Sequence, residues 1–229
     1  MKVKRKLTKE QKSLLVAMLI GDGTISTNYV FKMCHDGTQE EFLNWKINLL
    51  NQFQLKNNGL KTYISTKGYN VGKRIVYSQL SVIPTIKALR RSIYTPKKTI
   101  NRKLLNWLTP LGLAIWYMDD GFINVNTSKQ RHSIQHSIRI STCLTSEKEL
   151  KIIIDYFKEV WHINFRKYND NNHLSISTCT ENDTKKFVSI IKPYILQVPS
   201  LLYKIRNNYT KAQFLELQKE DPKCETLLL

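Results

Sequence analysis

The sequence contains the same pattern twice: an unbroken apolar run that ends in a carboxylate followed by glycine. The first copy is residues 15–23, LVAMLIGDG, and the second is residues 113–121, LAIWYMDDG. A helix that is apolar on every side must be buried on every side. A carboxylate at its last turn lies against the negative end of the helix dipole, which costs roughly 0.3–1 kcal/mol. The duplication therefore indicates that something positive, a metal ion or a lysine, lies where the two helix ends meet.

The charge balance indicates a polyanionic partner. The 229 residues include 36 lysines and arginines against 18 acids, a formal net charge of +18 that is spread along the chain. Such an excess favours a nucleic acid as partner. A membrane surface is the weaker alternative, because the sequence has no long apolar stretch and no separate basic amphipathic helix. The length allows one large domain or two smaller ones.

The cysteines and the N-terminus indicate a reducing compartment. No pair of cysteines has the CxxC or Cys/His spacing of a zinc site, and the basic start of the chain lacks the apolar core of a signal peptide. We therefore expect an intracellular protein, and the many Asn, Lys and Ile residues suggest an organelle or a bacterial or phage cytoplasm. The five histidines show no catalytic or metal-binding spacing, and none is assigned a role. The residues concerned are Cys34, Cys143, Cys179 and Cys224, and His35, His132, His136, His162 and His173.

The first half of the chain is predicted to follow the order α-β-β-α-β-β-α. Capping boxes at Thr8 and Thr38 would open its first two helices, and a turn at 67–70 would join two strands into a hairpin. Pro84 would lie in the first turn of the last helix. The expected elements are a helix ending at Asp22, strands at 24–25 and 30–34, a helix carrying Phe42, Trp45, Leu49 and Leu50 on one face, strands at 61–66 and 74–82, and a helix to about Tyr94.

The second half repeats this order. Pro110 would occupy the first turn of the motif helix, and Ser146 would open a capping box. The expected elements are a helix ending at Asp120, strands at 122–125 and 133–142, a helix carrying Ile153, Phe157, Val160 and Trp161, strands at 163–168 and 173–179 around an Asn-Asp-Asn-Asn turn, and a helix from about Asn182 to Tyr194. We predict an α+β fold of two pseudo-symmetric repeats, 1–100 and 101–204, followed by a basic segment, 205–229. The two motif helices would pair at the interface.

The predicted strands offer one apolar and one polar face. In 133–142, for example, Ser137, Arg139 and Ser141 alternate with Ile138 and Ile140. The apolar face would pack on helices, and the polar face would point outward. A twisted antiparallel ribbon can enter the major groove of DNA and present such side chains to base edges. The basic residues considered as DNA-binding candidates are Lys67, Arg74, Arg139, Arg166 and Lys167.

Asp22 and Asp120 are the predicted chemical centre. If the two helices pack side by side, their terminal carboxylates converge and repel each other unless a divalent cation lies between them, and hard oxygen ligands suit Mg²⁺. Such an ion can position water and stabilise charge on a phosphodiester. The alternative is that each Asp-Gly simply ends a helix, with Gly23 and Gly121 as left-handed caps. The duplicated frame favours the metal site.

The two motifs resemble the paired signature of the LAGLIDADG homing endonucleases, in the branch that carries both repeats on one chain. The resemblance extends to the segments 97–100, 191–194 and 203–204 and covers the chain from about Lys9 to Lys204. It implies that Asp22 and Asp120 are metal ligands. It also implies that Lys98 and Lys204 hold the places of basic residues near the scissile phosphates, and these four residues form the expected catalytic set.

The resemblance further implies a saddle of antiparallel sheets over a long, asymmetric DNA duplex. The expected reaction is Mg²⁺-dependent double-strand cleavage with short 3′ overhangs, which starts the copying of an intron or intein. The sequence departs from the family pattern at Val16 and Ile115, where small residues are favoured for close helix contact. Its Asp119 is a second carboxylate beside Asp120, and Gly21 occupies the matching position of the first motif.

Two other functions share these features. An RNA-binding intron maturase could use the same fold on its own intron RNA, with or without DNA cleavage. A transcription regulator with a degenerate nuclease fold would be expected to have lost one of the acids, and both are present. Since both repeats lie on one chain, we expect a monomer that binds double-stranded DNA and no membrane.

Overall fold

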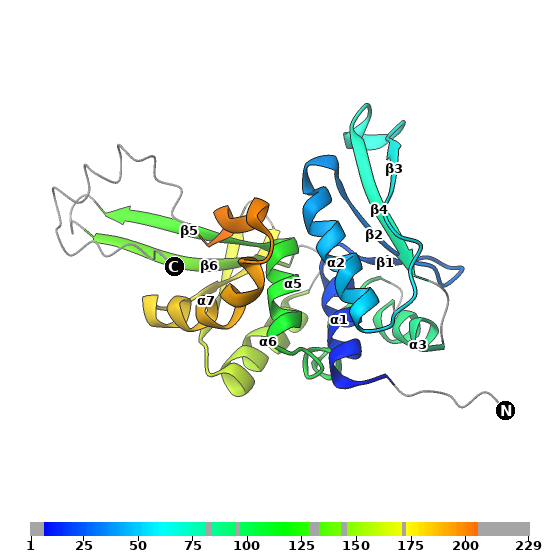
Figure 1. Ribbon diagram of the computed structural model, residues 1–229. Coiled ribbons are helices and arrows are strands. Elements are labelled where there is room, and N and C mark those ends of the chain that lie inside the picture. Colours follow the sequence, from blue (N-terminus) through cyan, green and yellow to red (C-terminus); the bar gives the residue numbers. More distant parts are fainter. Residues whose placement is uncertain are drawn as a thin grey trace.

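The two halves of the protein have the same order of elements on either side of a central helix pair (Figure 1). The computed structural model describes residues 7–80, 84–94, 97–128, 133–142, 146–170 and 173–205. Each half holds one four-stranded antiparallel sheet, with the orders β1-β2-β4-β3 and β5-β6-β8-β7. The predicted α+β fold of two pseudo-symmetric repeats is confirmed.

The elements of the first half agree with the predicted order. They are α1 (Lys9–Ile20), β1 (Thr24–Ile25), β2 (Phe31–Asp36), η1 (Gly37–Gln39), α2 (Glu40–Gln52), β3 (Lys61–Ile64), η2 (Gly68–Asn70), β4 (Arg74–Leu80) and α3 (Pro84–Ile93). Those of the second half are α4 (Arg102–Leu105), α5 (Pro110–Asp120), β5 (Gly121–Ser128), β6 (Ser133–Ser141), α6 (Glu147–Tyr156), the short π-helix η3 (Phe157–Trp161), β7 (Phe165–Asp170), β8 (His173–Thr178), α7 (Glu181–Ile195) and η4 (Pro199–Lys204). The basic segment predicted for 205–229 lies outside the described residues, apart from Ile205.

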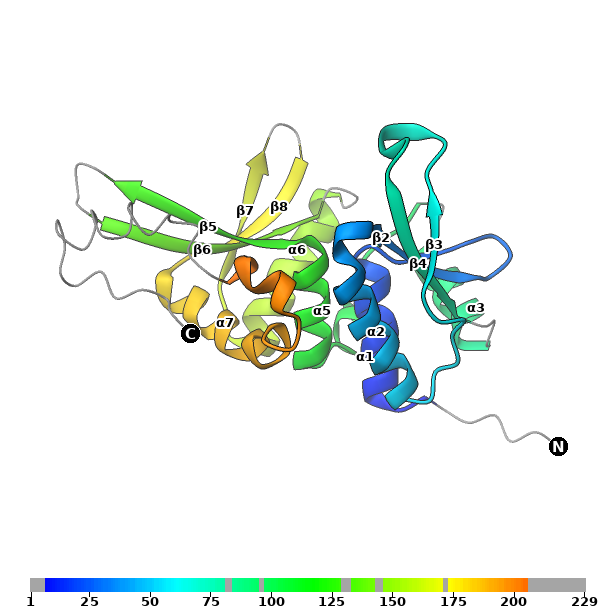
Figure 2. The same cartoon turned by 45° about the horizontal axis from the view of Figure 1, so that its top comes forward.

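The motif helices α1 and α5 pack side by side and run in the same direction, as Figures 1 and 2 show. At their N-terminal ends, Gly112 lies so close to Ser13 that a Cβ atom would collide with the Ser13 hydroxyl. That hydroxyl also accepts a hydrogen bond of 2.9 Å from the amide of Thr109. At the C-terminal ends, a Cβ atom on Gly21 would likewise collide with the side chain of Asp119. The close contacts therefore fall at the two ends of the helix pair, so the bulky Val16 and Ile115 do not prevent it.

Local sequence signals account for most helix starts. The capping boxes of Thr8 and Ser146 are both formed, and Pro110 occupies the first turn of α5 as predicted. The capping box predicted at Thr38 is wrong. The Asp36 carboxylate accepts a bond from the Thr38 amide instead, which stabilises the short helix η1 and delays the start of α2 to Glu40.

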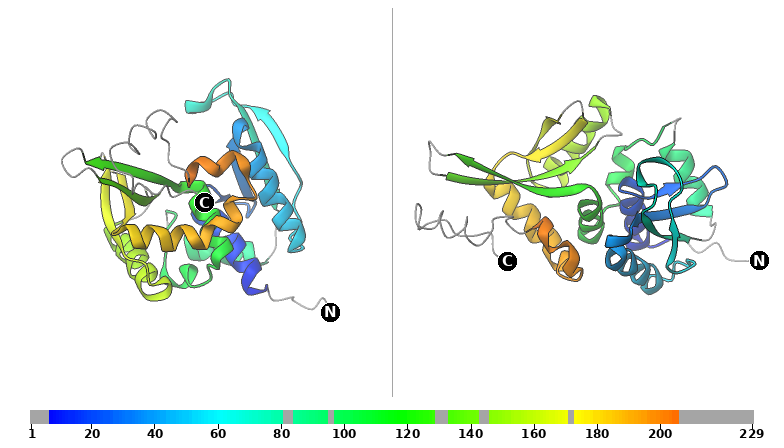
Figure 3. Two further views of the ribbon diagram at one scale, coloured as in Figure 1. Left: turned by 60° about the vertical axis from the view of Figure 1, so that its left-hand side comes forward. Right: turned by 90° about the horizontal axis from the view of Figure 1, so that it is seen from above.

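The sheet registers make equivalent positions in the two halves recognisable. Thr24, two residues after Asp22, pairs with Lys32, and Phe122, two residues after Asp120, pairs with Arg139. Lys32 and Arg139 are therefore at equivalent positions. Glu40 and Glu147, the first residues of α2 and α6, are separated by the same number of residues as Lys32 and Arg139. Seen from above, the two halves lie on opposite sides of the helix pair (Figure 3).

Candidate active site

The two motif acids lie at the adjoining ends of α1 and α5. Asp22 follows the C-cap residue of α1, and Asp120 is the last residue of α5. The Asp22 carboxylate is close enough to raise the pKa of Asp120. The Asp22 amide lies 3.4 Å from Oδ2 of Asp119. The structure thus brings together the two residues in which the sequence predicts a metal site.

The glycines of the two Asp-Gly pairs are not left-handed helix caps, which was the simpler explanation of these pairs. Neither Gly23 nor Gly121 is among the glycines with positive φ, so neither is a left-handed helix cap. Both are required by close contacts instead, because a Cβ on Gly23 would meet the Met18 carbonyl and one on Gly121 would meet the Tyr117 ring.

One lysine caps the end of each motif helix. The Lys98 ammonium donates to the carbonyl oxygens of Gly21 and Gly23 at 2.7 and 3.4 Å. The Lys204 ammonium donates to the carbonyl oxygens of Met118 (2.6 Å), Gly121 (3.0 Å) and Asp119 (3.2 Å). Positive charge at a helix C-terminus offsets the dipole that the motif acids oppose. Lysine is therefore the positive group at each end.

Lys204 has no donor left for an external ligand. An ammonium group has three donors, and the three carbonyls around Lys204 can accept all of them. Lys204 is buried, and its burial lowers its pKa despite the neighbouring acids. This geometry suits a residue that orients the end of α5 more than one that binds a phosphate.

A third carboxylate, Asp119, is completely buried and paired across the interface between the halves. Its Oδ1 accepts a bond of 2.5 Å from the ammonium of Lys46, a residue of α2 that is also buried. Lys46 donates in addition to Nε2 of His35 at 3.1 Å. Nδ1 of His35 lies 3.0 Å from Oε1 of Gln39, so the neutral tautomer with a proton on Nδ1 satisfies both contacts. Burial and the Lys46 charge lower the pKa of His35 to about 3, which keeps the ring neutral.

This buried group belongs to one half only. The positions equivalent to Asp119, His35 and Lys46 are Gly21, Thr142 and Ile153. None of these three can form a matching ion pair, and Ile153 is buried in the core. Neither His35 nor Lys46 is among the site residues predicted from the sequence. A signal for Lys46 was present, because this lysine lies on the apolar face of a helix between Phe42 and Leu49.

The charge of the site fits a divalent cation. Burial and then the Asp119 charge raise the pKa of Asp22, and burial, Asp119 and Asp22 raise that of Asp120 to about 7. Asp22, His35 and Asp119 offer ligand atoms within 4.8 Å of one another. The Lys46 ammonium bonds Oδ1 of Asp119 and Nε2 of His35, however, so the Asp22 carboxylate is the hard donor of this group that Lys46 leaves unused.

The raised pKa of Asp120 predicts a pH-dependent cost in the metal-free protein. Between about pH 4 and pH 7 the unfolded chain has lost a proton that the folded chain keeps, so stability falls as pH rises and levels off above pH 7. We expect Asp120→Asn to raise the free energy of unfolding at pH 8 by a few kcal/mol, on the order of 1.4 for each pKa unit. Near pH 4 the variant and the wild type should agree. Urea denaturation in EDTA at both pH values measures this, and an equal difference at both would contradict it.

The five DNA-binding candidates are placed on different faces. Arg139 and Arg166 lie on the outward face of the second sheet, on the strands either side of Ser177, with which both pair. Arg74 forms an ion pair of 2.6 Å with Glu40, and Lys167 forms one with Glu147, so both side chains reach the first residue of a helix behind their sheet. These two positions do not favour DNA contact.

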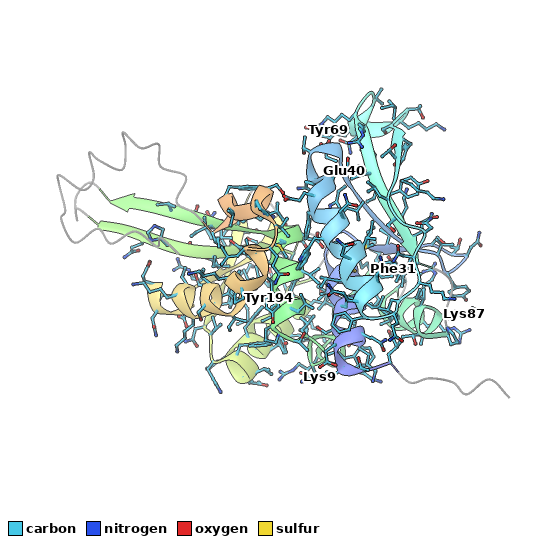
Figure 4. The ribbon with its side chains drawn as sticks, viewed as in Figure 1. Lys9, Phe31, Glu40, Tyr69, Lys87 and Tyr194 are labelled. Carbon is cyan, nitrogen blue, oxygen red and sulfur yellow. The ribbon has the colours of Figure 1, made fainter. Side chains whose placement is uncertain are left out.

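The hairpin between β3 and β4 carries the fifth candidate, Lys67, which is exposed next to η2. Figure 4 shows Tyr69 at the tip of this hairpin and Glu40 at the start of α2. Tyr69 is 94% exposed, so the hairpin end projects freely from the protein.

The sequence profile of the LAGLIDADG DNA endonuclease family matches residues 12–187. The chain belongs to this family. A solved structure described as the homing endonuclease I-WcaI bound to its DNA recognition sequence superposes with a TM-score of 0.72 at 19% identity. The alignment covers 90% of this chain and 89% of that one, and the likeness shows the shared fold.

Two curated relatives match less of their own length. Protein RecA of Mycolicibacterium flavescens is 28% identical over 212 residues, which are 87% of this chain and 47% of the relative. The cytochrome b mRNA maturase bI2 of Saccharomyces cerevisiae is 29% identical over 112 residues, 48% of this chain and 24% of the relative. The chain thus spans half or less of these proteins. Among the described residues, no helix is long and apolar enough to cross a bilayer.

Proposed function

We propose that this protein is a site-specific homing endonuclease that makes a double-strand break with 3′ overhangs in a long asymmetric DNA target, and so promotes the mobility of an intron or intein. The convergence of Asp22 and Asp120 at the ends of two parallel helices carries this proposal. Each repeat, 1–100 and 101–204, would bind one half of the target and cleave one of its strands. A single chain would then be active as a monomer.

Asp22 and Asp120 would hold Mg²⁺ between the repeats. When bound, the ion supplies Lewis-acid stabilisation of the phosphodiester and lowers the pKa of a coordinated water. Lys98 places positive charge near Asp120, since it lowers the pKa of that residue, and would stabilise the negative charge of the scissile phosphate. Lys204 would act as a positioning residue that fixes the end of α5 and hence the Asp120 carboxylate.

The outward faces of the two sheets would form the DNA saddle. The net charge of +18 supports a polyanionic partner, because phosphate neutralisation supplies most of the non-specific affinity for DNA. Arg139 and Arg166 lie on this face and are suited to contact bases or phosphates.

The proposal predicts cleavage of a randomised duplex library at one long site. We expect Mg²⁺ to yield fragments that share one sequence around the cut and carry 3′ overhangs, which sequencing of both ends would reveal. EDTA should prevent cleavage. Cutting of one strand only, cutting without a shared sequence, or no cutting at any tested divalent ion would each contradict the proposal.

A second candidate, an RNA-binding intron maturase, is supported by the match to the yeast maturase, which covers 48% of this chain. Keeping carboxylates at both helix ends gives RNA binding no advantage, which favours DNA cleavage. Competition between the selected duplex and structured intron RNA for the protein distinguishes the two. Tighter binding to RNA, together with no cleavage of DNA, would favour the maturase.

A further inference from the structure

Lys32 is held against two aromatic rings on the outward face of the first sheet. Its ammonium lies 4.5 Å from the ring centre of Tyr77 and 5.1 Å from that of Tyr63. The two rings meet edge to face with centres 5.6 Å apart. The long, flexible side chain of Lys32 is therefore restrained by this pair of aromatic rings.

Arg139 is held in the same way in the second sheet. Its guanidinium carbon lies 3.6 Å from the ring centre of Tyr168 and 5.9 Å from that of Phe122. The Nε atom is buried and has no hydrogen-bond partner in the protein. The buried Nε cannot reach outside the protein, so recognition falls to the terminal nitrogens of the guanidinium, which form no ion pair with the described residues.

The two cations occupy equivalent places in the two repeats. Lys32 pairs across the sheet with Thr24 and Arg139 with Phe122, each two residues beyond a motif acid. The rings come from different strands, β3 and β4 in one half and β5 and β7 in the other. The two repeats thus reach one arrangement with different aromatic residues, which points to the restrained cation as the feature they share.

Two other basic residues of the sheets are neutralised by acids, and Lys32 and Arg139 are not. Arg74 and Lys167 pair with Glu40 and Glu147 behind their sheets. Within the part of the chain that the structure describes, neither Lys32 nor Arg139 forms an ion pair with a carboxylate. Both therefore present an uncompensated charge on the outward face.

We propose that Lys32 and Arg139 are a matched pair of specificity residues, each recognising a guanine in the major groove at mirror-related positions on either side of the cleavage centre. This inference rests on the proposed endonuclease function. Arginine and lysine donate to O6 and N7 of guanine, the commonest specific contact in this groove. Equal spacing from Asp22 and Asp120 sets both contacts at equal distance from the cut.

The aromatic rings make the recognition more selective. A long free side chain loses conformational entropy when it binds, and holding it in place beforehand reduces that loss. A restrained donor also cannot swing to an acceptor on a neighbouring base pair. The rings thereby convert a flexible charge, which would contact phosphates without sequence preference, into a group with a fixed direction.

Lys32→Met and Arg139→Met test this in the full-length protein with a randomised duplex library. Each variant should lose about 5- to 150-fold of the preference for guanine at one position. The two positions should lie in opposite half-sites at the same distance from the cut. Arg74→Met and Lys167→Met are the matched controls, one in each repeat, and should leave the profile unchanged. Lys32→Arg should keep the guanine preference, and Tyr168→Leu, which keeps the cation but removes its ring, should weaken it partially.

The same library selected by binding in EDTA gives a readout that does not need cleavage, and thermal melting identifies variants that fail to fold. Loss of affinity without any change in preference would overturn the inference, as would relaxed positions at unequal distances from the cut. In both cases a selective wild type would leave the endonuclease function intact. A wild-type protein that neither selects nor cuts a sequence would overturn both proposals.

Discussion

Asp22→Asn and Asp120→Asn are each expected to lower the rate of double-strand cleavage by about 10³-fold, while the affinity for the target duplex stays within a few-fold of the wild type. A metal ion contributes several kcal/mol to a phosphodiester transition state, and about 4 kcal/mol corresponds to a factor of 10³. An amide keeps the size of the side chain but is a poor ligand for a hard cation. Single-turnover cleavage, together with binding of the uncut duplex in EDTA, separates the two effects.

Asp155→Asn provides the matched control. This aspartate lies on α6, paired with Lys151 on the protein surface and outside the site. It should change neither rate nor affinity. Wild-type cleavage by either motif variant would remove the assigned metal site. An equal loss of binding and cleavage would instead show that the acids support the fold or the DNA contact rather than the reaction.

The sequence predicted the parts of this site that repeat and missed the part that does not. Two apolar helices ending in acids could be recognised because each signal appeared twice in the same frame. The lysines at the helix ends were assigned through the resemblance alone. What their ammonium groups contact depends on where 97–100 and 203–204 lie in space, which no local pattern encodes.

The alternation of buried and exposed positions along a strand assigns each of its residues to one face of the sheet. In β7, Phe165 is buried and Arg166 is exposed. Lys167 therefore shares the helix-facing side of the strand with Phe165, and the same parity groups Arg74 with Val76 and away from Tyr77. A basic residue on a predicted strand is thus a poor guide to DNA contact unless its face is assigned. Lys32, which is not among the predicted candidates, lies on the outward face of β2, opposite the buried Phe31 and Met33.

The buried pair of Lys46 and Asp119 could not be predicted because its members come from different repeats. Lys46 by itself is a lysine in an apolar stripe, and Asp119 by itself is a second acid in a motif. Their meeting follows from the contact between α1 and α5, which brings the end of α5 toward α2. Gly21 makes room for it, since the side chain of Asp119 fills the space that a Cβ would need.

Lys46→Met is expected to destabilise the protein by about 3–5 kcal/mol, because it leaves the fully buried Asp119 carboxylate without its partner. Asp119→Asn should also be strongly destabilising, since it leaves a buried ammonium that is only 1% exposed. The double variant should recover much of the loss, because replacing both charges of a buried pair is often close to neutral. Urea denaturation of the four proteins yields the coupling energy directly.

Lys167→Met is the control for this cycle. It removes a lysine from an ion pair with Glu147 in which both side chains are largely exposed, and such pairs contribute about 0–1 kcal/mol. Additive effects of Lys46→Met and Asp119→Asn would show that the two residues are not coupled. If they are coupled, the pair fixes the end of α5 against α2. The spacing of Asp22 and Asp120 then depends on a contact that only one of the two repeats can make.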